Sequence, residues 1–109
     1  MLTNTPAVTV WEKTIVNHAA SYVRHQTGAA YWEETHGQTV GGMARDADNN
    51  VLVIIHASCI GEYIPKPDDR IANGVSEREQ PPSDALTVTA VKRFLYGPAI
   101  GQHIEVTAK

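Results

Sequence analysis

Three side chains in this sequence have the types that hydrolytic chemistry uses: Glu34, His56 and Cys59. Glu34 precedes a glycine-containing stretch that ends at Gly42, a kind of place where a fold can hold a catalytic carboxylate. His56 and Cys59 lie three positions apart, and a cysteine beside a histidine can form a thiolate nucleophile. Residues three apart on a strand point to opposite faces, so this pair requires a turn between them. The alternative is a hydrogen-bonded histidine and a buried, unreactive cysteine.

The segment around Glu34 resembles the first half of the JAMM/MPN (JAB) metalloprotease domain. In that family a helix is followed by a glutamate and then by two glycines with the spacing Gly-x-x-x-Gly. Here Glu34 is followed by Gly37 and Gly41. Residues 82–86 and 97–106 look like the part of that family that follows its metal motif.

By this resemblance, Glu34 takes the place of the general base, which removes a proton from a zinc-bound water. The family's zinc ligands include two histidines one residue apart. This sequence has no such pair; its histidines are His18, His25, His36, His56 and His103. Because MPN domains without the metal serve as scaffolds and dimerisation modules, the resemblance implies that role. We therefore expect no cofactor, with zinc only under the peptidase alternative, and the metal ligands stay unknown.

The composition indicates a globular protein rather than a nucleic-acid or membrane protein. The net charge is -3, and the lysines and arginines do not cluster into the basic face that phosphate contacts require. The longest apolar run, Val51 to Ile55, is too short to span a bilayer. A single cysteine suits a reducing compartment, and the N-terminal residues lack the pattern of a signal peptide. We expect a cytoplasmic protein.

The hydrophobic pattern predicts one α+β domain over residues 1–109, with a mixed sheet of about four strands and two helices packed on it. Apolar side chains at three- and four-residue steps predict the first helix over residues 12–26. Ser83 is the expected N-cap of the second helix, which ends before Gly97. The β-branched residues in 87–89 leave a strand open as the alternative there.

The remaining segments are predicted to be strands and loops. Strands are expected at residues 8–11, 38–45, 51–58 and 100–106. Residues 1–6 are expected to form a flexible tail. Residues 61–83 contain four of the six prolines and predict a long loop, which leaves room for a short strand near 71–75. Long loops of this kind are often functional.

Tyr31, Trp32 and Tyr63 are aromatic residues in predicted loops. Exposed together, they would form a binding patch, because aromatic side chains dominate interface hot spots. The alternative is that they cap the core.

These features favour a small cytosolic protein–protein interaction module, either a non-catalytic MPN-like scaffold or a phage- or plasmid-type inhibitor or immunity protein. A homodimer through a sheet edge or the aromatic patch is left open. The alternative is a hydrolase, either a divergent metallopeptidase with Glu34 as general base or a cysteine enzyme that uses Cys59.

Overall fold

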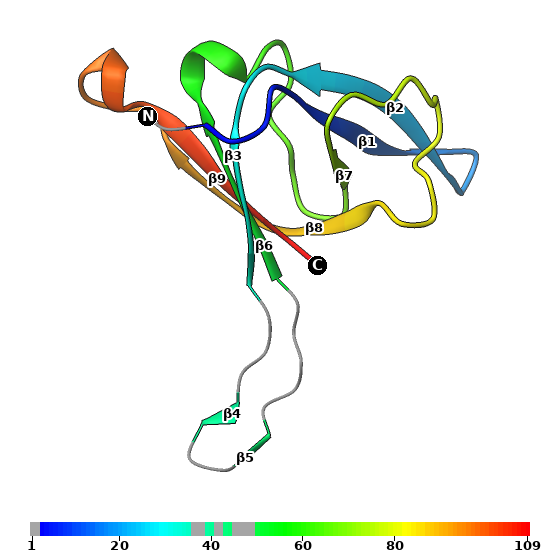
Figure 1. Cartoon of the computed structure of the whole chain (residues 1–109). Coiled ribbons are helices and arrows are strands. Elements are labelled where there is room, and N and C mark those ends of the chain that lie inside the picture. Colours follow the sequence, from blue (N-terminus) through cyan, green and yellow to red (C-terminus); the bar gives the residue numbers. More distant parts are fainter. Residues whose placement is uncertain (1–2, 36–38, 41–42, 45–49) are drawn as a thin grey trace.

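The computed structural model describes residues 3–35, 39–40, 43–44 and 50–109, and these residues form mostly β-strands (Figure 1). Seven strands make one antiparallel sheet in the order β2-β1-β7-β8-β9-β6-β3. Their bounds are β1 Val8–Val16, β2 Ala19–Thr27, β3 Tyr31–Thr35, β6 Asn50–His56, β7 Arg70–Asn73, β8 Leu86–Phe94 and β9 His103–Ala108. Two short 3-10 turns, η1 Ala57–Cys59 and η2 Ala99–Gly101, are the only helical elements in the described part of the chain. The predicted α+β fold is therefore wrong.

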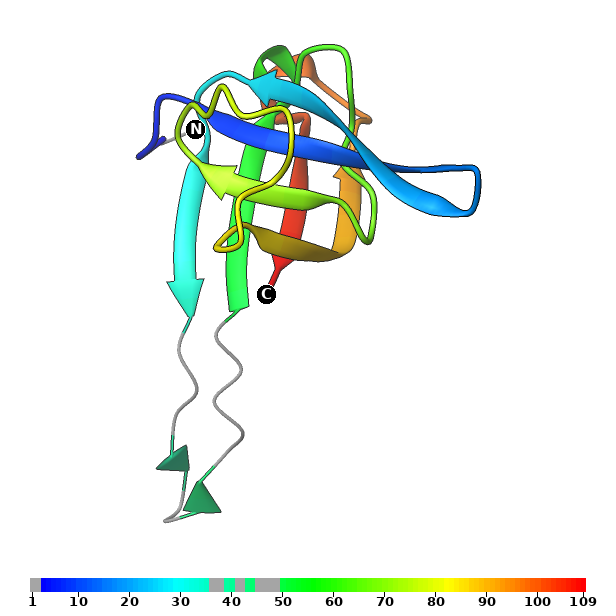
Figure 2. The same ribbon diagram turned by 90° about the vertical axis from the view of Figure 1, so that its right-hand side faces the viewer.

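The sheet bends back over itself, and β8 makes the bend. The start of β8 pairs with β7 through Ile71 and Leu86, and its later residues pair with β9. A register shift between Val88 and Ala90 lies at the change of partner, where a bulge increases strand twist. As a result β1, β2 and β7 cross over β3, β6 and β9 (Figure 2).

Strict alternation of side chains produces the core between the two halves of the sheet. Val51, Val53 and Ile55 are buried in β6, while the residues between them are half-exposed. On β9, Ile104 and Val106 are buried in the same way. Because alternate residues point to opposite faces, each of these strands has one inner and one outer face.

The predicted helix over residues 12–26 is instead the β1–β2 hairpin. Asn17 and His18 form its two-residue turn with φ values of 52° and 65°, the left-handed conformation that such hairpin turns require. Asparagine tolerates this conformation, and Ile15 and Val16 before it are β-branched, so local chemistry favours the strand. The helical spacing of the apolar residues was coincidental.

The predicted second helix is β8, so the alternative left open by the β-branched residues at 87–89 is the one observed. The predicted loop over 61–83 contains β7, near the expected short strand. Residues 4 and 5 of the expected flexible tail are bonded to the start of β3, where Thr5 and Ala30 form a bridge.

The strand predicted over 38–45 lies partly outside the described residues. Within it, β4 (Thr39–Val40) and β5 (Met43–Ala44) pair antiparallel with each other. His36, Gly37 and Gly41, which contribute to the family resemblance, also lie outside the described residues. No helix in the described part is long and apolar enough to cross a membrane.

Candidate functional site

Glu34 lies near the end of β3 and lines a pocket of about 300 Å³ between β3, β7 and β8. Trp32 and Asp84 line the same pocket, whereas His56 and His103 line a different one. Among the described histidines, neither His56 nor His103 therefore shares a pocket with Glu34. Among the described residues, no group of three or more His, Cys, Asp and Glu side chains could hold a metal ion. These residues do not fit the zinc site that the peptidase alternative implies.

His56 is the N-cap of η1 and Cys59 is its last residue. A turn between the two residues is therefore present, as the catalytic pairing of His56 and Cys59 would require. His56 Nδ1 instead lies 2.8 Å from the Ser58 hydroxyl and accepts the Ser58 N–H at 3.2 Å, as the N-cap of the turn. His56 Nε2 lies 3.0 Å from the Ile100 carbonyl oxygen. A carbonyl only accepts hydrogen bonds, so Nε2 carries the proton and Nδ1 is the acceptor. Both ring nitrogens are thus occupied by bonds that hold the turn and η2, and neither bonds Cys59.

Cys59 itself packs against the core. Its sulfur lies 3.8 Å from the Ser58 hydroxyl oxygen, and its carbonyl accepts the Gly28 N–H at 2.8 Å. This arrangement corresponds to the alternative of a packed cysteine and a hydrogen-bonded histidine.

The three aromatic residues predicted to form one patch do not share a surface. Trp32 and Tyr63 pack against the core. Tyr31 is paired with Ile54 and lies on the opposite side of β3 from Trp32, because neighbours on a strand alternate.

The side of the sheet on which Tyr31 lies is turned away from the core and carries apolar side chains among charged and polar ones. Register places Ile54 opposite Tyr31, and His56 opposite His103, which is in turn opposite Phe94. The Phe94 and His103 rings are stacked with centroids 4.8 Å apart. We call this surface the outer face; its apolar and aromatic residues are Tyr31, Leu52, Ile54, His56, Phe94 and His103, and Glu33, Lys92, Glu105 and Thr107 lie on the same side.

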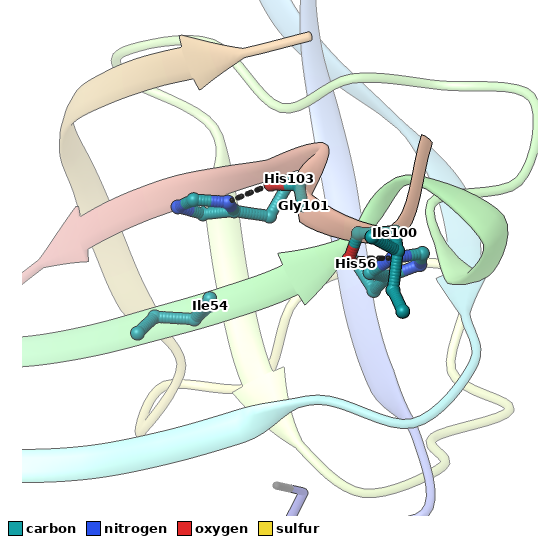
Figure 3. A pocket seen from close by; sticks show the side chains of 5 residues that line it. All are labelled: Ile54, His56, Ile100, Gly101 and His103. Carbon is teal, nitrogen blue, oxygen red and sulfur yellow. Dashed lines mark hydrogen bonds between the residues drawn. The ribbon is translucent and has the colours of Figure 1, made fainter. Parts of the chain in front are cut away.

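A pocket of about 360 Å³ opens at one end of the outer face (Figure 3). It is lined by Ile54, His56, Ile100, Gly101 and His103. Ile100 is 85% exposed and Tyr96 is 72% exposed, so large apolar side chains surround the pocket with little protein contact of their own. The pocket therefore joins an apolar lining to an exposed hydrophobic side chain, Ile100.

Charges of both signs lie beside this pocket on the outer face, where Lys92 is paired with Glu105, while Arg93 is opposite the buried Ile104 on the other side of β8. No Asp or Glu occurs from Ala85 to Ile104, a stretch that includes Lys92 and Arg93. Both cations are exposed on β8. Glu105 is the nearest acid in sequence, and His103 already bonds it at 3.1 Å.

His103 is held in surroundings that favour its charged form. Its Nδ1 donates to the Gly101 carbonyl at 2.8 Å, and this bond raises the pKa of His103 above its ordinary value; partial burial opposes the shift and Glu105 adds to it. The stabilisation is present below the ordinary pKa and is lost as the pH rises through the raised one. We expect the His103 ring protons to titrate by NMR above the range of a free imidazole. Glu105→Gln should lower that midpoint; an unchanged midpoint would contradict the assigned role of Glu105.

The densest group of titratable side chains lies elsewhere, around the fully buried Asp69. Its carboxylate accepts hydrogen bonds from Tyr63 Oη at 2.5 Å and from Lys66 Nζ at 3.0 Å. Tyr63 also stacks on His25, which bonds Glu12 at 2.9 Å. The group fastens the loop after η1 to the β1–β2 hairpin, so its evident role is structural.

Alkaline pH should loosen this group. Burial, together with the Asp69 carboxylate, raises the pKa of Tyr63 to about 12. Burial lowers the pKa of Lys66, but hydrogen bonds to Tyr63 and Asp69 outweigh it and the net shift is upward. Because the unfolded chain loses these protons first, stability is intact below about pH 10 and falls between about pH 10 and 12.

The check is a spectrophotometric titration of the four tyrosines. We expect the last tyrosine to ionise near pH 12, and we expect this ionisation step to be missing in Tyr63→Phe. A Tyr22→Phe variant is the matched control and should retain it.

Comparison with family models, curated proteins and solved structures finds no match for this chain. The JAMM/MPN resemblance therefore stays a prediction, and the helices it relied on are strands in this structure.

Reasoning from the sequence missed the outer face. Its members come from four strands, and Phe94 was assigned to a helix. The available signal was the alternation in residues 52–56 and 103–107, which places Ile54, His56 and His103 on the side away from the buried residues.

Proposed function

We propose that this chain is a small, non-catalytic protein–protein interaction module that binds a partner protein on its outer face. The observation that supports this most directly is the apolar pocket at one end of that face. In an antiparallel sheet with one face on the core, the other face is usually polar. Here Ile54 and Ile100 line the pocket, Phe94 stacks on His103 beside it, and Ile100 is exposed.

The chemistry of the pocket indicates what the partner presents. An apolar side chain of the partner would enter the space lined by Ile54 and Ile100. Acidic residues on either side of it would meet Lys92 and the His103 imidazolium. We therefore propose a partner segment with an apolar residue between carboxylates.

This mode of action suits an inhibitor or immunity protein, which works by occupying a partner. It requires neither a metal nor the MPN resemblance, and we place the protein in the cytoplasm. The hydrolase alternative has less support, because Glu34 is in a separate pocket and both nitrogens of His56 are bonded within the turn.

The proposal is tested by titrating the isotope-labelled full chain with a synthetic hexapeptide in which leucine and phenylalanine are flanked by aspartates. We expect saturable NMR shifts concentrated at Ile54, His56, Ile100 and His103. Ile100→Asp should weaken binding by about tenfold or more, since it removes apolar contact and adds a repelling charge. Val75→Asp, at a residue that is 60% exposed away from this surface, is the matched control. Failure to saturate, or equal binding by both variants, would refute this partner chemistry.

Binding of the same peptide should depend on pH. As the pH rises through the raised pKa of His103, the imidazolium loses its charge and the attraction to the peptide carboxylates weakens. We expect tighter binding at pH 6 than at pH 8, and no such difference for a peptide with asparagines in place of the aspartates.

A further inference from the structure

The β2 strand is an edge of the sheet without the usual protection. Within the described part of the chain it pairs only with β1. Native proteins protect edges with lysine, proline or bulges, because unpaired N–H and C=O groups recruit other strands. β2 contains no lysine or proline, its one charged side chain, Arg24, is bonded to the Ser76 carbonyl, and its pairing with β1 runs without a register shift from Ala19 to Thr27.

Half of this edge belongs to a ribbon that projects from the body of the protein (Figures 1 and 2). β1 pairs with β7 only from Val8 to Trp11, so beyond Trp11 the hairpin consists of two strands. Ile15 and Val16 are exposed there, and Val23 of β2 is 46% exposed. A two-stranded ribbon in water is marginally stable, so a further strand would stabilise it.

The backbone groups on the free side of β2 can be identified from the turn. The residues that flank a two-residue hairpin turn, Val16 and Ala19, form a hydrogen-bonded pair, and such pairs alternate along the hairpin. The main-chain groups of Ala20, Tyr22 and Arg24 therefore point away from β1. In agreement, the N–H of Lys13, the partner of Tyr22, donates to Asp69 at 2.9 Å.

We propose that β2 pairs antiparallel with β2 of a second copy of this chain, with the two-fold axis at Val23. Val23 is the midpoint of the strand, so this register places the two strands symmetrically about that residue. It places the outward groups of Tyr22 in one copy opposite those of Arg24 in the other, where they satisfy each other. The two Val23 side chains then meet at the axis.

The charges in β2 are compatible with this register. Arg24 is the only Lys, Arg, Asp or Glu residue in the strand, so no two like charges face each other. It lies opposite Tyr22 of the other copy, a cross-strand pair of cation and aromatic ring. Gly61 lies close to the Gln26 carbonyl: a Cβ added to Gly61 would be 3.5 Å from that oxygen. The accessible part of the edge therefore runs from Ala20 to Arg24.

Disulfide trapping in the full chain tests the register. In a Cys59→Ala background, Val23→Cys places two thiols at the axis, where opposed Cα atoms of such a pair are about 4.5 Å apart. That spacing permits a disulfide. Ala20→Cys is the matched control, because its two copies would lie about 20 Å apart along the strands. We expect oxidised Val23→Cys to become a covalent dimer and Ala20→Cys to stay monomeric. Equal trapping of both variants would overturn the register.

Sedimentation of the unmodified chain over a range of concentrations tests the dimer itself. We expect a reversible dimer. Val23→Lys should raise its dissociation constant at least tenfold, while Val75→Lys should leave the dissociation constant unchanged. A chain that is monomeric at all concentrations, or that forms larger assemblies insensitive to Val23→Lys, refutes the proposal. Ile100→Asp should leave the dimer intact, so failure here is distinguishable from failure of the outer-face proposal.

Discussion

Asp69→Ala is expected to lower the free energy of unfolding by about 3–4 kcal/mol, because it removes the buried acceptor of several hydrogen bonds at once. The Asp69 side chain is fully buried. One carboxylate oxygen accepts the Lys13 N–H at 2.9 Å and the other accepts the Lys66 N–H at 3.0 Å. Without the carboxylate, both main-chain donors lose their partners, as does the Tyr63 hydroxyl.

Two further variants separate this effect from a general effect of losing charge. Asp69→Asn keeps the shape of the side chain. Because each carboxylate oxygen of Asp69 accepts a main-chain N–H, the amide nitrogen of asparagine would face one of these donors. We expect this variant to be nearly as unstable as the alanine variant. Asp68→Asn changes the exposed neighbour, whose φ of 78° asparagine tolerates, and should remain within about 0.5 kcal/mol of the parent chain. Urea unfolding followed by circular dichroism measures all three. A parent-like midpoint for Asp69→Ala would contradict the structural role of this group.

Trp11→Ala is expected to cost about 3–5 kcal/mol, the range for truncating a buried tryptophan. Trp11 is fully buried on the side of β1 opposite Val10, and its indole N–H donates to the Arg78 carbonyl at 2.9 Å. This bond holds residues 74–78, which we call the strap, next to the indole ring. Thr9 bonds the strap at Gly74 and Ser76, and Arg24 bonds the Ser76 carbonyl.

The strap gives this variant a second readout. Hydrogen exchange of the Ser76 amide, which donates to the Thr9 hydroxyl at 2.9 Å, should accelerate in Trp11→Ala more than exchange in β6 and β9. Trp11→Phe retains most of the packing but loses the bond to Arg78, so we expect a smaller loss of about 1–3 kcal/mol. Val75→Ala, at an exposed position in the strap, is the control. Uniform acceleration across the sheet would show that Trp11 stabilises the whole fold rather than the strap.

The two incorrect helices show where local pattern and long-range pairing diverge. Over residues 12–26 the apolar residues recur at helical steps, yet the left-handed Asn17 and His18 reverse the chain and β1 pairs with β2 residue by residue. In β8 the β-branched run is a strand because β7 and β9 supply its partners. Strand preference depends strongly on such neighbours, so periodicity alone could not decide between helix and strand.

The candidate site residues show the same division. The sequence located His56 and Cys59 and showed that a turn was needed between them. It could not show that the Ile100 carbonyl, far along the chain, would take one ring nitrogen of His56. Nor could it show that Tyr63 would turn inward to Asp69 while Tyr31 joined an apolar outer face.

By itself, the sequence predicted strands over residues 51–58 and 100–106, which overlap β6 and β9, and it located the proline-rich segment 61–83. These follow from alternation and turn chemistry, which act over a few residues. Only the tertiary structure decided that the described strands form a seven-stranded sheet bent over itself, that His56 and His103 meet across two strands, and that β2 lies at an edge of that sheet, paired on one side with β1. Strand pairing joins residues far apart in the chain, and no local pattern specifies which partners will meet.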